Sequence, residues 1–234
     1  MKKLFLFAAA AIAALTVSAQ TLDFPEIIAS ADFGATRTFE KDGISLVVSN
    51  GNNKFAVDAN TQRFGNAQAY AKDTMRLKTG GASGSKSSMV LNVPADGKIT
   101  VHARSASGTV ARTLTFSQNG LDILNANLND ADAVEVEETK ADQTKEQVKV
   151  FPVFTCNVKA GAIDLSYGEV GTGSTETDES KIKAGGINIY AIVFEAAQGI
   201  NNTNAAVKVE KFYRDGQLII RKNGVEYNAL GARL

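Results

Sequence analysis

Four short segments in which apolar and polar residues alternate, all between Met75 and Phe116, constrain the fold of this chain most strongly. They cover residues 75–79, 87–93, 98–104 and 110–116. In the third segment Ile99, Val101 and Ala103 alternate with polar side chains. A period of two places one set of side chains against a core and the other toward water. The stretches between the segments are rich in Gly, Ser, Asp and Pro, which favour turns. These residues predict antiparallel strands packed as a sandwich.

Similar patterns continue on both sides of this region. Strands are predicted at residues 24–28, 36–40, 44–49, 54–59, 121–124, 148–158, 162–167 and 186–196. The last of these is apolar on both faces, which predicts a central, covered strand. Residues 148–158 predict one inner strand with a bulge at Pro152. Residues 60–72 are polar and predict a loop closing over one end of the sandwich, and residues 130–142 are acidic and predict an exposed strand followed by a solvated loop.

The two ends of the chain differ from its body. Residues 1–19 begin with Lys2 and Lys3, continue with an apolar run and end in small residues, as secretory leaders do. The run of about 14 apolar residues is too short to span a bilayer comfortably. Three short strands near the C-terminus, at 207–213, 217–221 and 225–228, are separated by Asp-Gly and Asn-Gly pairs that favour hairpins.

The expected organisation is therefore a leader, a sandwich domain, a linker and a small terminal unit. Their bounds are residues 1–19, 20–196, 197–206 and 207–234. The fold class is all-β: an antiparallel jelly-roll-like β-sandwich with a small C-terminal three-stranded β-meander. A leader predicts export, to the outer surface or the medium, with the periplasm as an alternative.

The charge balance limits the classes of partner. Basic and acidic residues number 25 each, and loss of Lys2 and Lys3 with the leader brings the net charge to about −2. Such a chain lacks the basic footprint expected for nucleic acid or an anionic membrane surface. The single cysteine, Cys156, cannot form an internal disulfide, and its apolar neighbours favour a buried structural thiol over a nucleophile.

Signs of catalysis are weak, so the chain is more readily explained without an enzymatic activity. No motif of nucleotide, zinc or serine-hydrolase chemistry occurs in a fitting context. Glu135, Glu137 and Glu138 crowd together, but a solvated acidic strand explains them. A pair of carboxylates from distant positions, as used in glycoside hydrolysis, remains an alternative.

Four basic residues are candidates for binding a ligand. Arg76 and Lys78 fall on outward positions of one predicted strand, and His102 and Arg104 on those of another. If the two strands are neighbours, the side chains form a basic strip that suits the carboxylate groups of uronate sugars. The alternative is a solvated outer face on which long side chains cover the sheet.

Aromatic and oxygen-bearing residues add two further candidates. Tyr70, Tyr167 and Tyr190 offer rings on which a sugar could stack, and Tyr70 is favoured because Tyr190 falls in the covered strand. The oxygens of Asp58, Asn60 and Asp73 are candidate ligands of a structural calcium ion, although Asp and Asn near strand ends also serve turns. No other cofactor is expected.

Two parts of the chain resemble known families. The tail, with its Asp-Gly-Gln turn, its Lys-Asn-Gly-Val-Glu-Tyr-Asn hairpin and a Leu-Gly ending followed by a basic residue, resembles the C-terminal type IX sorting segments of secreted Bacteroidetes proteins. That resemblance implies export machinery as a partner. The body resembles the carbohydrate-binding-like β-sandwich modules of pectate lyases, which implies a jelly-roll-like fold and a sugar-binding or accessory role. The matching segments are 54–60, 75–81, 99–105, 112–114 and 186–190.

These observations support three hypotheses of function. The leading one is an exported, non-catalytic β-sandwich protein that contacts polysaccharide at the cell surface. The second is an envelope or adhesin-like structural protein with a protein partner. The third is a polysaccharide-degrading enzyme with an unrecognised pair of carboxylates.

Overall fold

The structure is a computed structural model of the chain. It describes residues 19–51, 53–80, 87–169, 185–197, 209–214, 217–222, 225–228 and 233–234. The chain divides into two compact units, Met1–Ala197 and Gln198–Leu234. The expected leader, apart from residue 19, and most of the expected linker lie outside the described residues. No helix in the described part of the chain has the length and apolar character that a bilayer span requires.

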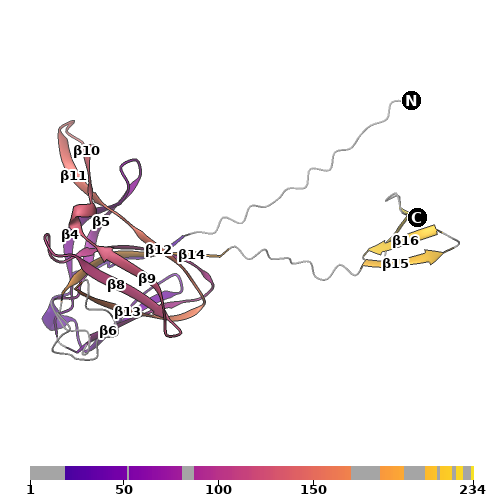
Figure 1. Ribbon diagram of the computed structural model, residues 1–234, viewed down its shortest axis with the longest axis horizontal. Helices are drawn as coiled ribbons and strands as arrows, with labels where there is room; N and C mark the ends of the chain where they lie inside the picture. The colour runs from indigo at the N-terminus through magenta and orange to yellow at the C-terminus, as the bar shows by residue number, and fades with distance from the viewer. Residues whose placement is uncertain are drawn as a thin grey trace. The chain divides into compact units, whose positions relative to one another are not determined.

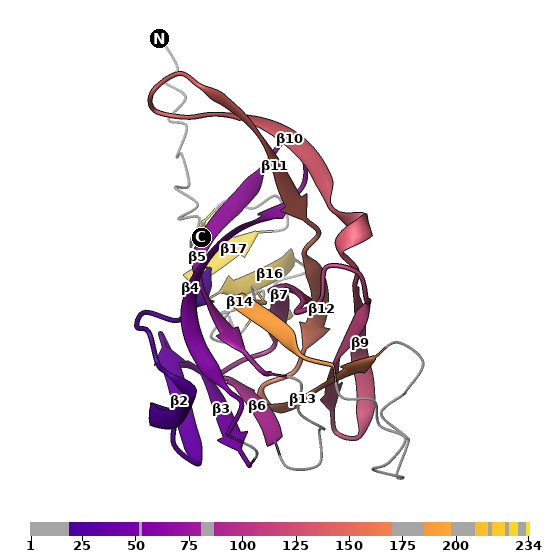
Figure 2. The same ribbon diagram turned by 90° about the vertical axis from the view of Figure 1, so that its left-hand side faces the viewer.

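One sheet of the first unit has six strands, all of them antiparallel to their neighbours (Figures 1 and 2). In spatial order the strands are β2 (Thr36–Lys41), β3 (Ile44–Asn50), β6 (Ser87–Val93), β13 (Gly161–Glu169), β8 (Arg112–Gln118) and β9 (Leu121–Leu128).

The second sheet of this unit has eight strands. Along its main path lie β10 (Val134–Thr139), β11 (Lys145–Phe151), β4 (Ala56–Gly65), β5 (Tyr70–Lys78), β14 (Ile187–Ala196), β7 (Gly97–Ser105) and β12 (Phe154–Val158). A short strand, β1 (Gln20–Leu22), pairs with β14 beside this path. The chain changes sheet after β1, β3, β5, β6, β7, β9, β12 and β13. The all-β sandwich that the sequence predicts is therefore confirmed.

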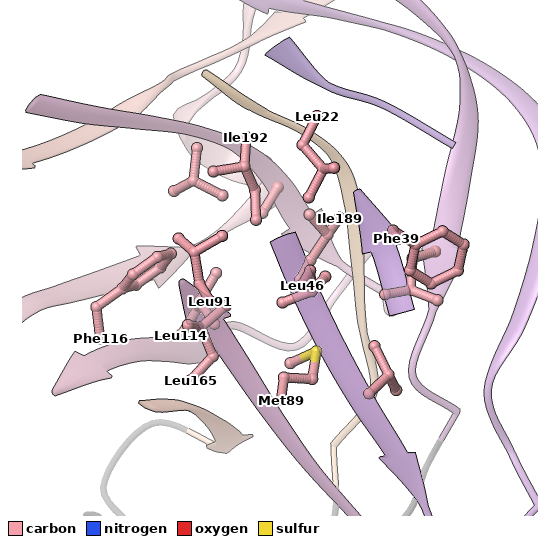
Figure 3. Close-up of a cluster of buried hydrophobic side chains, with 14 of the residues drawn as sticks. Leu22, Phe39, Leu46, Met89, Leu91, Leu114, Phe116, Leu165, Ile189 and Ile192 are labelled. Carbon is pink, nitrogen blue, oxygen red and sulfur yellow. The ribbon is translucent and has the colours of Figure 1, made fainter. Parts of the chain in front are cut away.

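The two sheets enclose one main core. Leu46 and Leu91 of the six-stranded sheet and Ile189 and Ile192 of the eight-stranded sheet are completely buried, and Figure 3 shows them in the same cluster. Burying an aliphatic side chain of this size contributes about 1.5–3 kcal/mol. The alternation seen in the sequence thus supplies the inner face of each sheet. The half-buried Cys156 packs against this core and is a free thiol, so the core forms without a disulfide.

The predicted central strand is also confirmed. β14 lies between β7 on one side and β5 and β1 on the other, and its residues from Ile187 to Ile192 are buried. The register shifts between Ile189 and Ala191, so Tyr190 lies at a bulge. A bulge re-aims side chains locally, and this one lies opposite the candidate residues of β7.

Two expectations about local structure were wrong. Residues 60–72 are not a loop: β4 and β5 run through them and form a hairpin, whose turn is closed by Asn66 N–H donating to the Ala69 carbonyl at 2.9 Å. The segment is polar because this part of the hairpin extends beyond the main core, and its polarity suggested a loop. A bulge between Ala59 and Gln62 also interrupts its alternation.

Residues 148–158 are not one inner strand. They form the end of β11 and all of β12, and the chain passes from one strand to the other at Pro152 and Val153. In the strand order of the eight-stranded sheet, β11 is next to one edge and β12 is at the other edge. Proline cannot donate a ladder hydrogen bond, so pairing ends there rather than passing a bulge. β11 pairs with β4 in parallel, at Val150 and Phe151, which departs from a purely antiparallel sheet. Residues 24–28 contribute only a single bridge, between Ile28 and Val57.

The second unit contains the predicted three-stranded antiparallel sheet. Its strands are β15 (Val209–Arg214), β16 (Gln217–Lys222) and β17 (Val225–Asn228). Ile219 is buried at its centre, and Glu226 accepts from Arg214 at 2.8 Å and from Arg221 at 2.6 Å. The two predicted hairpin turns, 215–216 and 223–224, lie outside the described residues.

Candidate functional site

The four predicted basic residues lie on the outer face of the eight-stranded sheet, but their strands are not neighbours. β14 lies between β5 and β7. Asn188 of β14 pairs with Lys78 on one side and Arg104 on the other, so these three residues form one cross-strand row. Neighbouring strands are about 4.8 Å apart, which places β5 and β7 about 10 Å apart. The expected continuous strip is therefore divided by β14.

The half of this face near β7, called the covered half, is closed over by other segments. It consists of His102, Arg104 and Tyr190, with Phe64 of β4 and Phe151 of β11 packed on them. The His102 ring stacks on Phe64 with ring centres 5.3 Å apart, and the Arg104 guanidinium lies 4.5 Å from the centre of the Phe151 ring. This arrangement is a second small core rather than an open surface.

Most polar groups in the covered half are bound to other parts of the protein, whereas Arg104 Nε and Asp130 Oδ1 are buried without a hydrogen-bond partner. His102 Nδ1 lies 2.7 Å from Asp73 Oδ2, and Arg104 donates to Asp130. The Tyr190 hydroxyl donates to Asn60 Oδ1 at 2.6 Å, and burial raises the pKa of this phenol despite the nearby Arg76 and Arg104. Since buried polar groups are costly when unpaired, these contacts hold the β4–β5 hairpin and the turn at Asp130 onto the sheet. They leave His102 and Arg104 little capacity for a ligand.

The other half, called the open half, consists of Asp58, Arg76 and Lys78. Arg76 donates from Nε to Asp58 Oδ1 at 2.7 Å and from a terminal nitrogen to Oδ2 at 3.3 Å. Lys78 Nζ lies 3.1 Å from the same Oδ2. The side chains are 21% exposed for Arg76, 34% for Asp58 and 41% for Lys78. Two cations thus share one carboxylate at a surface that solvent reaches, which leaves one positive charge in excess.

The ionisation of Asp58 follows from this sharing. Partial burial alone would raise its pKa, but the hydrogen bonds from Arg76 and Lys78, with their charges, hold the pKa of Asp58 below its ordinary value. For the cation Arg76 the sign is reversed: burial alone would lower its pKa, but its contacts with Asp58 and Tyr190 hold the pKa above the ordinary value. Both shifts favour the ionised forms of Asp58 and Arg76 at neutral pH.

The three tyrosines lie in different places. Tyr70 is the first residue of β5, opposite Gly65, so most of the length of that strand separates it from Lys78. Tyr167 belongs to β13 in the other sheet and packs against the main core, and burial raises its pKa. Tyr190 is buried in the covered half. The structure therefore brings none of these rings to the exposed part of the open half.

The candidate calcium ligands do not converge. Asp58 binds Arg76 and Lys78, Asn60 accepts from Tyr190, and Asp73 lies against His102. Among the residues that the structure describes, no group of three or more His, Cys, Asp or Glu is placed to hold a metal ion.

The acidic cluster and the cysteine lie apart from this face. Glu137 of β10 accepts from Lys145 at 2.6 Å and Glu138 accepts from Arg63, while Glu135 faces Lys149 across the hairpin. A paired, largely exposed strand accounts for them. Burial raises the pKa of the Cys156 thiol, which favours its protonated form.

Sequence reasoning missed the residues that cover the face, chiefly Phe64, Phe151 and Asp130. Phe64 fell in the supposed loop, and the bulge before it shifts the period by which it would have been recognised. Phe151 stands directly before Pro152. The sequence predicts a bulge there within one strand, whereas in the structure β11 ends at Phe151. Asp130 begins a 3-10 turn, Asp130–Asp132, with Asn129 as its cap, which is a short-range signal for a turn but none for its partner.

Comparison with known proteins gives no family. No family model matches the chain, and no curated protein matches it. Solved structures do match. A carbohydrate-binding module (CBM6) of Cellvibrio mixtus lichenase 5A in complex with cellotriose is 15% identical, with 76% of this chain and 96% of that chain covered and a TM-score of 0.24.

Two further structures give similar values. The C-terminal CBM6 of LamC, a laminarinase from Zobellia galactanivorans, is 14% identical over 64% of this chain and 98% of its own, with a TM-score of 0.25. An adhesin domain of the Lys-gingipain of Porphyromonas gingivalis is 15% identical over 76% of this chain and 98% of its own, with a TM-score of 0.29. Likeness at this level carries no inference about ligand or activity.

Proposed function

We propose that this chain is an exported, non-catalytic β-sandwich protein that binds acidic polysaccharide through the open half of its eight-stranded sheet. The observation that carries the proposal is the sharing of Asp58 by Arg76 and Lys78 on an accessible sheet face. The excess positive charge there attracts a uronate carboxylate.

The geometry suits a carboxylate in particular. Arginine binds carboxylates through two parallel N–H donors, and Arg76 already does so with Asp58. Lys78 is the more exposed of the two cations and would contact the ligand first. An exposed ion pair contributes at most about 1 kcal/mol, so strong binding requires several such contacts along one polymer.

Export and surface location belong to the same proposal. The basic, apolar and small-residue regions of residues 1–19 support a leader, and the tail resembles a sorting segment. Recovery of the full-length chain from the cytoplasm, with its first residues uncleaved, would argue against export.

Binding of the intact chain to polygalacturonate tests the function. We expect retention that weakens as salt rises, and much weaker retention on fully methyl-esterified pectin, which lacks the carboxylates. Lys78→Ala should reduce binding several-fold. Lys41→Ala is the matched control, because Lys41 is 45% exposed and also paired with one aspartate, but lies on the other sheet.

The variant Asp58→Asn distinguishes recognition of a carboxylate from non-specific adhesion to the polymer. The Asp58 carboxylate occupies the place between Arg76 and Lys78 that a ligand carboxylate would take. Removing its charge should therefore tighten binding to polygalacturonate. Absence of binding by both the native chain and Asp58→Asn would overturn the proposal, and capture of a protein partner without any glycan would favour the adhesin-like alternative.

A further inference from the structure

Asn188 lies on the outer face of the eight-stranded sheet, between the open half and the covered half. It belongs to β14, directly opposite Lys78 of β5 on one side and Arg104 of β7 on the other. Its neighbours Ile187 and Ile189 belong to the main core, so the side chain of Asn188 points outward. The residue is nonetheless only 4% exposed. A polar carboxamide therefore forms the floor between the two cations.

The carboxamide of Asn188 makes no hydrogen bond with any residue that the structure describes. It differs from Arg104 Nε and Asp130 Oδ1, which are closed off from solvent without a partner, so a small part of it is accessible. Burying most of a polar side chain without a protein partner lowers stability, and such groups are rare in folded proteins. A role in binding a ligand explains why an asparagine is found here.

Both cations beside Asn188 are bound to carboxylates. Lys78 Nζ lies 3.1 Å from Asp58 of β4, which is on the opposite side of β5 from β14. Arg104 donates to Asp130. The Lys78 side chain is 41% exposed and that of Arg104 is 19% exposed. An incoming anion therefore reaches Asn188 from the side of Lys78.

The spacing of Lys78 and Asn188 suits two neighbouring groups of one sugar. Directly opposite residues of adjacent strands have Cβ atoms about 5 Å apart. A ligand carboxylate on Lys78 thus brings the atoms next to it within reach of the carboxamide. In a uronate those atoms include the ring oxygen and hydroxyl groups, whereas in an acidic polypeptide they are methylene groups. A carboxamide both donates and accepts hydrogen bonds, so it can pair with either kind of sugar oxygen.

We propose that Asn188 is a ligand-binding residue that determines specificity at the open half. When Lys78 binds a uronate carboxylate, the Asn188 carboxamide forms a hydrogen bond with a sugar oxygen beside that carboxylate. The site then prefers polyuronate to other polyanions, because only a uronate satisfies both residues. This inference rests on the function proposed for the open half. It supplies a selectivity that Arg76 and Lys78 alone do not, since their charge attracts any anion.

Two variants of nearly equal shape test the proposal. Asn188→Val removes the hydrogen-bonding group, Asn188→Thr keeps a hydroxyl, and both side chains are β-branched and suit a strand. The probes are polygalacturonate and polyglutamate, each titrated into the intact chain at the same salt concentration. We expect Asn188→Val to bind polygalacturonate several-fold more weakly than the native chain, because a hydrogen bond to the ligand is lost. Asn188→Thr should keep most of the affinity, and neither variant should change binding to polyglutamate.

Thermal unfolding gives a second readout. Valine replaces a mostly buried carboxamide that has no partner in the protein, so Asn188→Val should have a higher Tm than the native chain. A lower Tm would show that the carboxamide serves the fold, which would overturn the proposal. Asn92→Val is the matched control: Asn92 also points outward, but from β6 of the other sheet, and donates to Ser45 at 3.3 Å. This control should leave binding to both polymers unchanged.

The binding results separate the role of Asn188 from the function of the open half. Equal affinity of the native chain and Asn188→Val for polygalacturonate would overturn the role of Asn188 while the function stands. Equal losses of affinity for polygalacturonate and polyglutamate would also overturn it, because the carboxamide would then give no selectivity. Failure of the native chain to bind polygalacturonate would overturn both.

Discussion

Phe64 covers His102 and Tyr190 on the outer face of the eight-stranded sheet. Its ring stacks on His102, lies 4.8 Å from the ring centre of Tyr190 and 5.9 Å from that of Phe151, and is almost completely buried. His102 therefore lies in an aromatic and ionic environment made by the protein itself. His102 points outward from its strand, yet it has a structural role because Phe64, which is far away in the sequence, packs on its ring.

Replacing Phe64 tests this role. Phe64→Ala should lower the free energy of unfolding by about 3 kcal/mol, because it removes most of the second core and leaves a cavity. Urea denaturation measures the change. Lys72→Ala, an exposed position on the same hairpin, should stay within about 0.5 kcal/mol of the native chain. A loss below about 1 kcal/mol for Phe64→Ala would mean that the covered half is held chiefly by its ion pairs.

Asp58 makes the stability of the sheet depend on pH. Its pKa is held below the ordinary value in the folded chain, so ionised Asp58 stabilises the fold. For a lowered pKa this contribution is complete above about pH 4, the unfolded value, and disappears as pH falls through the folded value. The pair is partly exposed, which limits the contribution to about 1 kcal/mol at most.

The variant Asp58→Asn should show this dependence directly. It is expected to be less stable than the native chain at pH 7, and the difference should vanish under acid conditions where Asp58 is protonated. Thermal unfolding of both proteins across the acid range measures it. A difference that stayed constant with pH would assign the effect to packing or hydrogen bonding rather than charge.

At the scale of elements, the sequence is informative where structure is local. The inward residues of β3, β6 and the first half of β7 could be predicted because they alternate with outward ones. The central place of β14 could be predicted because the strand is apolar on both faces. The same alternation identified Arg76 and Lys78 as outward. Their partner Asp58 and the covering residues could not be assigned, since these contacts depend on the order of strands in the sheet, on a bulge in β4 and on the break at Pro152.

The β10–β11 hairpin extends beyond the rest of the first unit (Figures 1 and 2). β11 pairs with β4 only at Val150 and Phe151, so the outer part of the hairpin, up to Thr139 and Lys145, is a two-stranded ladder. Two-stranded ladders are marginally stable in water. β14, in contrast, has partners on both sides and a buried surface.

Hydrogen exchange should therefore separate the two elements. We expect peptides from the outer β10–β11 hairpin to exchange by local opening, orders of magnitude faster than peptides from β14, which should require global unfolding. Mass spectrometry of exchanged, digested protein measures both. Equal protection would indicate that the hairpin is held by contacts other than those with β4 and Arg63.

At the scale of the whole molecule, the first unit contains a core of its own. Its buried cluster draws on strands from β1, with Leu22, to β14, with Phe194, and on both sheets. The described part of the second unit has three strands, and Ile219 is the one apolar side chain buried among those described there. Small sheets of this kind bury too little surface to be strongly stable alone.

Removal of the second unit tests where stability resides. A chain ending at Ala197 should unfold cooperatively, with a free energy of unfolding within about 1 kcal/mol of that of the intact chain. Chemical denaturation of the two forms, followed by circular dichroism, measures the difference. Ala197 itself must be kept, because its N–H donates to the Asp96 carbonyl in the turn before β7. A loss of several kcal/mol would show that the terminal sheet completes the fold of the sandwich, and its role would then be structural rather than that of a separate sorting segment.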